Sequence, residues 1–195
     1  MWLKNTNALH IHIPKCGGMA LRKYFEHEEI ETKEVHRSLR NHISHNPERV
    51  KKAFVFTTVR NIYEQLVSMW CYYKRKDAST INMSLESFYL DYKERNIPIK
   101  ACKQVEKLTP LDKVNYICFL PRINEDIKQV CQLIGIEHKG DVTVFNTTNH
   151  RDYREYMTGK FIDFVRREYK EEIREFGYSP NDPCSFKINN KIKFI

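Results

Sequence analysis

The chain has 195 residues, of which 41% are hydrophobic and 30% are charged, and its formal net charge is +8. This balance is typical of a globular domain and argues against a disordered chain. The excess of basic residues favours an anionic partner, but no zinc-finger spacing, RNA-binding motif or basic helix supports nucleic-acid binding.

Two features of the sequence bear on the cellular compartment. The N-terminal stretch MWLKNTNALHIHIPK has no long apolar run, so we expect neither a signal peptide nor a membrane span, and a cytoplasmic protein. The six cysteines form no Cys-x-x-Cys pair and show no zinc spacing with histidine, which favours free thiols in a reducing compartment.

Strand and helix patterns alternate along the chain. Runs of apolar and β-branched residues predict strands at 8–13, 53–59, 115–120 and 142–145. Apolar residues at helical spacing predict helices at 19–27, 62–73, 85–92, 125–134 and 161–176. Asn61 is the predicted cap of the second helix, and Gly135 and Gly177 end the last two. Residues 74–80 are predicted as a loop, and 26–46 and 93–109 are polar stretches without a clear period.

This alternation favours an α/β fold with a central, mainly parallel sheet flanked by helices. We expect one domain over residues 1–195, in which residues from about 180 to 195 form a C-terminal arm.

The most informative stretch is IHIPKCGGMAL, residues 11–21, which runs from a strand through a proline, a lysine and two glycines into a helix. Gly17 and Gly18 allow the backbone to approach a ligand closely, and the helix that follows directs N–H groups at an anion. Lys15 adds a positive charge beside them. The lysine precedes the glycines and no Ser or Thr follows, so this is not a Walker A loop. A plain strand-to-helix turn is the alternative.

The loop PKCGGMAL resembles the 5′-phosphosulfate loop of sulfotransferases that use 3′-phosphoadenosine 5′-phosphosulfate (PAPS), and is most similar to the carbohydrate and heparan-type enzymes. Lys15, Gly17, Gly18 and Leu21 match that pattern, and a histidine such as His12 often precedes it. Cys16, Met19 and Ala20 replace Thr, Thr and Ser, so the loop loses side-chain hydroxyls but keeps its backbone donors.

A second stretch, FVFTTVRNIYEQLVSMW, resembles the 3′-phosphate motif of the same family. Arg60 and Ser68 match at the family spacing, whereas Ile62 and Gln65 replace the usual Pro and Arg. Arg60 follows a predicted strand, where its guanidinium can grip a phosphate. Either motif alone is a weak signal, but both in order, each after a β run, are much less expected by chance.

The resemblance covers about two-thirds of the chain, because NYICFLPRINEDIKQVCQLIGI and NHRDYREYM with the following helix also resemble family segments. It implies a P-loop-like three-layer fold and PAPS as co-substrate, with no metal. It also implies that Lys15, Cys16, Gly17, Gly18, Met19, Ala20, Arg60 and Ser68 bind the nucleotide and that Arg151 lies near its phosphate.

Sulfuryl transfer needs a group that stabilises the leaving oxygen and a base for the acceptor hydroxyl. Lys15 is the candidate for the first role. His36 is the candidate for the second, because it matches a histidine that acts as base in similar glycan sulfotransferases; a surface histidine without a role is the alternative. His10 and His12 share a strand face, but no third metal ligand is implied.

We therefore expect a sulfotransferase acting on a hydroxyl acceptor, with a glycan favoured by the resemblance. One alternative is a sulfotransferase fold kept as a nucleotide- or glycan-binding module without catalysis, which the loss of loop hydroxyls favours. Another is an ATP-dependent, kinase-like enzyme, although the sequence shows no acidic magnesium ligand at a strand end. The acceptor hydroxyl and the oligomeric state do not follow from the sequence.

Overall fold

The computed structural model describes residues 1–28, 35–90, 102–143 and 150–188. They divide into two compact units, each treated by itself below. The sheet unit comprises Met1–Arg60 and Gln104–Phe145, and the helical unit comprises Asn61–Lys103 and Asn146–Asn189. No helix within the described ranges is long and apolar enough to cross a membrane.

The sheet unit contains a parallel sheet of three strands in the order β1-β2-β3. The strands are β1 (Ala8–Ile11), β2 (Phe54–Val59) and β3 (Tyr116–Phe119). The helices of this unit are α1 (Gly18–Tyr24), α2 (Leu39–His45), α3 (Pro47–Lys52), α6 (Gln104–Leu108) and α7 (Ile123–Ile134), with single 3-10 turns η4 (Leu111–Lys113) and η5 (Leu120–Arg122). This arrangement confirms the predicted α/β class with a parallel sheet flanked by helices.

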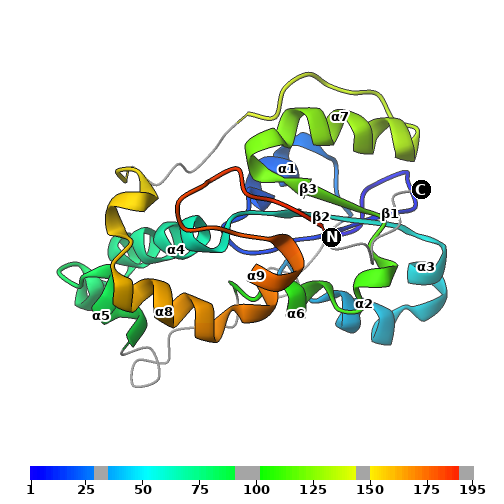
Figure 1. Cartoon of the computed structure of the whole chain (residues 1–195). Coiled ribbons are helices and arrows are strands. Elements are labelled where there is room, and N and C mark those ends of the chain that lie inside the picture. Colours follow the sequence, from blue (N-terminus) through cyan, green and yellow to red (C-terminus); the bar gives the residue numbers. More distant parts are fainter. Residues whose placement is uncertain (29–34, 91–101, 144–149, 189–195) are drawn as a thin grey trace. The chain divides into compact units, whose positions relative to one another are not determined.

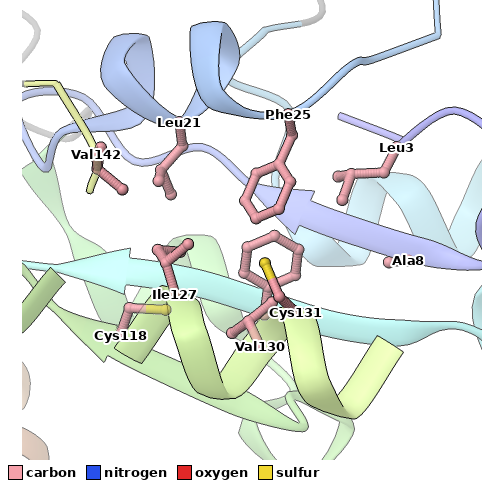
Figure 2. Packing of buried hydrophobic residues seen from close by; sticks show 10 residues of the cluster. Leu3, Ala8, Leu21, Phe25, Cys118, Ile127, Val130, Cys131 and Val142 are labelled. Atoms are coloured by element: carbon pink, nitrogen blue, oxygen red, sulfur yellow. The ribbon is translucent and has the colours of Figure 1, made fainter. Parts of the chain in front are cut away.

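Helices cover both faces of this sheet. Figure 1 shows α1 and α7 on one side of the strands and α2, α3 and α6 on the other. Figure 2 shows the first interface, where Leu21 of α1 points toward Ile127 of α7 and Phe25 points toward Cys131. Side chains of β1 and β2 alternate between this interface and the opposite face, and both sets are buried. Burial on both faces is what a parallel sheet requires.

A buried carboxylate fixes the connection between β3 and α7. The buried carboxylate of Asp126 accepts hydrogen bonds from the Phe119 N–H (2.6 Å) and the Tyr116 hydroxyl (3.1 Å), and so ties the end of β3 to the first turn of α7. Helix α7 ends at Gly135 with φ 71°, as predicted. The two hydrogen bonds of Asp126 fix the turn that follows β3, which lies at the same edge of the sheet as the loop after β1.

The helical unit contains α4 (Ile62–Lys76), η2 (Ala78–Thr80), α5 (Leu85–Leu90), η6 (Tyr153–Tyr156), α8 (Gly159–Glu168) and α9 (Lys170–Phe176). Asn61 caps α4, as predicted, by accepting the Tyr63 N–H. Its amide nitrogen donates to the carbonyls of Ser179 (2.9 Å) and Asp182 (3.0 Å), which holds the segment after α9 against this cap. Aromatic packing of Tyr89 on Phe161 and Phe164 joins α5 to α8.

Several predicted boundaries are wrong for identifiable reasons. Helix α1 ends at Tyr24, before the predicted 27, because the chain turns there so that His27 can pair with Leu3. The single helix predicted at 161–176 is two helices, since Tyr169 leaves helical geometry (φ −123°, ψ 31°) while its ring stays buried beside Phe164.

Other differences concern segments predicted as irregular or extended. Helices α2 and α3 arise within and just after the polar stretch 26–46, and α6 arises in 93–109. Helix α4 continues to Lys76 because its last turn carries three basic residues that suit the negative end of a helix. Val142, predicted to begin a strand, is not in one, and its N–H bonds the Asn124 side chain; residues 144 and 145 lie outside the described ranges.

The buried histidines of the sheet unit predict a loss of stability in acid. Burial lowers the pKa of His12 and of His42 from 6.5 to about 3, so both are neutral in the fold and protonated in the unfolded chain below pH 6.5. The unfolded state then binds more protons. These two groups alone lower the free energy of unfolding by roughly 2 kcal/mol between pH 6 and pH 5. His10 and His27, whose pKa values are also lowered by burial, add to the fall.

Urea unfolding of a Trp70→Phe variant, followed by Trp2 fluorescence, measures this change in the sheet unit alone, because Trp2 is buried there against His42. Equal stability at the two pH values would contradict the assignment of both imidazoles as neutral. In a His42→Gln background the fall should be smaller by about 1 kcal/mol, because one of the contributing histidines is gone.

Candidate functional site

The candidate site lies at the carboxyl edge of the parallel sheet. Strand β1 pairs with β2 so that Ile11 lies opposite Thr57, and β2 pairs with β3 so that Val59 lies opposite Phe119. The Thr57 hydroxyl also donates to the Ile11 carbonyl at 2.7 Å. Because parallel strands end at the same edge, the loop after β1, Arg60 after β2 and the turn after β3 meet there. Ligands bind at this edge in open α/β sheets.

The loop after β1 has a backbone shaped by two left-handed residues. Lys15 has φ 64° and Gly17 has φ 80°, and α1 begins at the next residue, Gly18. A side chain at Lys15 in this conformation carries strain, which is stored at functional sites more often than elsewhere. No side chain caps α1 and its first turn holds no acidic residue, so the positive end of the helix is left for an anion.

The three loop residues that depart from the family pattern have different surroundings. Cys16 is buried, Ala20 is half-buried and Met19 is 44% exposed. None carries a hydroxyl, so the loop offers an anion only backbone N–H groups and the Lys15 ammonium.

Arg60 is joined to this loop directly. Its guanidinium Nη1 donates to the Lys15 carbonyl at 3.2 Å. The carbonyl of Arg60 in turn accepts a 2.7 Å hydrogen bond from the side-chain amide of Gln104, a fully buried residue of α6. The two motifs that sequence analysis assigned to the two phosphates of one nucleotide are therefore in contact, and α6 holds the backbone of the second.

His12 lies between the loop and His36. A Cβ atom placed on Gly18 would lie 1.9 Å from Cδ2 of the His12 ring, so the bare α-carbon of Gly18 rests on that imidazole. On its other side the His12 ring contacts the ring of His36, with 4.5 Å between centroids. The ring of His12 thus contacts both Gly18 of the loop and His36, the predicted base.

His36 is held from two directions while part of it stays exposed to solvent. Its carbonyl accepts a 2.7 Å hydrogen bond from Nζ of Lys107, and its side chain bonds the backbone of His12. Burial of the imidazole against His12 lowers its pKa below 6.5; the hydrogen bond to His12 opposes this shift and the Lys107 charge adds to it. A neutral imidazole at pH 7 is the form that can accept a proton.

Ser68 and Arg151, the other predicted nucleotide ligands, belong to the helical unit. Ser68 is buried on α4. Arg151 is exposed, pairs with Glu155 at 3.1 Å and lies 5.7 Å over the Tyr156 ring. The structure therefore places Lys15, Arg60 and His36 in the sheet unit and Ser68 and Arg151 in the helical unit.

Sequence reasoning missed Gln104 and Lys107. Both lie on α6, in the polar stretch 93–109 that showed no clear period, and both act on residues far away along the chain. No local signal in a single sequence identifies such a support. The described residues contain no group of three or more His, Cys, Asp and Glu side chains arranged to hold a metal ion.

Comparison with family models, curated proteins and solved structures finds no match to this chain.

The contact between Gly18 and His12 predicts that a single methyl group is costly at this position. Gly18→Ala would force the His12 ring to move, and we expect the free energy of unfolding to fall by about 1–3 kcal/mol, as in other overpacked cores. Urea unfolding measures the change. Gly159→Ala is the matched control, because no atom lies within 4 Å of its added Cβ. Equal effects of the two substitutions would contradict the tight contact.

Proposed function

We propose that the chain is a sulfotransferase that moves a sulfuryl group from PAPS to a hydroxyl acceptor. The observation that carries the proposal is the hydrogen bond from Arg60 to the Lys15 carbonyl, which joins two motifs that resemble the two phosphate-binding motifs of this family. Their meeting follows from the parallel pairing of β1 with β2, and it places both motifs at the edge where ligands bind in open α/β sheets.

In the proposed reaction the acceptor oxygen attacks sulfur in line with the bond to the 5′-phosphate. A new S–O bond forms, the old one breaks, and its electron pair leaves on the phosphate oxygen. Lys15 stabilises that oxygen, and the backbone N–H groups of Gly17 and Gly18 supply further donors. The hydroxyl proton passes to the neutral imidazole of His36. Arg60 holds the nucleotide through its 3′-phosphate.

The absence of hydroxyls in the loop favours a second candidate, a nucleotide-binding module that does not catalyse transfer. Cys16, Met19 and Ala20 stand where the family has Thr, Thr and Ser. Lys15 and His36 are the chemical groups that the reaction itself needs, and both are present, so we prefer the enzyme. A hydroxyl acceptor on a glycan is the substrate that the resemblance favours.

The donor site is tested by thermal unfolding with adenosine 3′,5′-bisphosphate. At a hundred times its dissociation constant the ligand stabilises by about 2.7 kcal/mol, which corresponds to roughly 5–10 °C in a chain of this size. We expect this shift for the wild type, a much smaller shift for Lys15→Ala and Arg60→Ala, and none with ATP and magnesium. Lys128→Ala, which removes an exposed charge from α7, is the control. No shift at saturating bisphosphate would refute the donor site.

The base is tested by transfer of radiolabelled sulfate from PAPS to a panel of glycans, small alcohols and tyrosine peptides. His36→Ala is expected to lower kcat by 10²–10⁴-fold, a range typical of lost general-base catalysis, while bisphosphate binding is retained. Because the pKa of His36 lies below 6.5, the wild-type rate should reach half its plateau below pH 6.5. Binding of bisphosphate without transfer to any acceptor would favour the binding module instead.

A further inference from the structure

His12 is buried to 97%, so its imidazole would be expected to form hydrogen bonds, yet Nδ1 has no hydrogen-bond partner among the described residues. Its 3% exposed fraction leaves almost no water to replace one. A polar ring kept in such a place is costly, and an aliphatic side chain would avoid the cost. His10 is buried in the same way and lacks partners for both ring nitrogens, so what distinguishes His12 is the set of groups that its ring contacts.

Three contacts define what the His12 ring does. One face carries Gly18, the first residue of α1, at a distance that only glycine allows. The ring of His36 lies against it at 4.5 Å between centroids, tilted by 57°. The ring of His10 is stacked on it at 6.0 Å, tilted by 14°. The flat ring of His12, which follows the end of β1, therefore lies against both Gly18 of the loop and the ring of the predicted base.

We propose that His12 is a positioning residue whose ring sets the distance between the phosphate loop and His36. The inference rests on the proposed function, because it assigns His36 the role of base. The His12 ring acts as a spacer: it contacts Gly18 of the loop and the ring of His36, while Lys107 donates a hydrogen bond to the His36 carbonyl. Transfer is sensitive to such spacing, since a misplacement of about 1 Å can cost 10²-fold in rate.

The charged and titratable groups that act on His12 come from several segments. They are His36, His27, Arg22 of α1, the amino group of Met1 and the stacked ring of His10. All of them remain in a His12 variant, and the control described next removes only His10, so the pair of variants separates a spacer from a general electrostatic effect.

The test compares His12→Gln with His10→Gln, which each remove one of two buried, mutually stacked imidazole rings. His10 packs on Phe56 and His12 and serves as the matched control. NMR titration of the His36 ring is the first measurement, and it needs no activity. We expect the pKa of His36 to rise toward 6.5 in His12→Gln, because the ring that buries it is gone, and to stay lowered in His10→Gln.

The second measurement is the rate of transfer. His12→Gln should lower kcat roughly 10- to 100-fold, with bisphosphate affinity within about threefold of wild type, whereas His10→Gln should retain kcat. An unchanged His36 titration in His12→Gln, or equal changes in both variants, would overturn the proposal. If wild type shows neither bisphosphate binding nor transfer, the proposed function fails, and the titration still decides whether His12 positions His36.

A second variant covers the case in which His12→Gln does not fold. His12→Phe keeps a flat buried ring, slightly larger than imidazole, and replaces the ring nitrogens, of which Nδ1 already lacks a partner, with carbon. A spacer predicts that His12→Phe keeps the lowered pKa of His36 and a kcat within about threefold of wild type. A folded His12→Phe protein in which the pKa of His36 has returned to 6.5 would show that the ring is not acting as a spacer.

Discussion

The parallel pairing of β1 with β2 is the constraint on which the candidate site depends. It brings Lys15 and Arg60, which are far apart in the sequence, to one edge of the sheet, where the Arg60 guanidinium reaches the Lys15 carbonyl. The pairing is reinforced by the Thr57 hydroxyl and by helices on both faces, so the edge is a rigid platform. Catalytic groups on such a platform need no reorganisation when charge develops.

The proposed anion site would be built without side-chain hydroxyls. Its donors would be backbone N–H groups of a loop in which Lys15 and Gly17 are left-handed, together with one ammonium group. Such donors depend on backbone shape, so the proposal allows Cys16, Met19 and Ala20 at positions where the similar family has hydroxyl residues. For the shape of this loop, Gly17, Gly18 and the His12 ring against Gly18 then matter more than the side chains of residues 16, 19 and 20.

The parts of the fold predicted correctly are those with strong local patterns. The apolar runs of β1, β2 and β3 and the apolar periodicity of α7 were sufficient to predict these elements. The meeting of Lys15 with Arg60 follows from the parallel pairing of the strands that precede them. Helices α2, α3 and α6 were missed because their apolar faces are short and interrupted by charge. Gln104 and Lys107 were missed with them, since they act through long-range contacts that no local pattern encodes. The break at Tyr169 reflects packing of a buried ring, which overrode helical periodicity.

The most direct test of the central claim, that two distant motifs form one anion site, is a double-mutant cycle on bisphosphate affinity. Calorimetric titration of wild type, Lys15→Ala, Arg60→Ala and the double variant gives the coupling free energy between the two residues. Lys15 and Arg60 are proposed to bind different phosphates of one ligand, so each single substitution should weaken bisphosphate binding about tenfold or more, and the double variant should bind more weakly than either. Wild-type affinity in either single variant would contradict the account, because that residue would then lie outside the site.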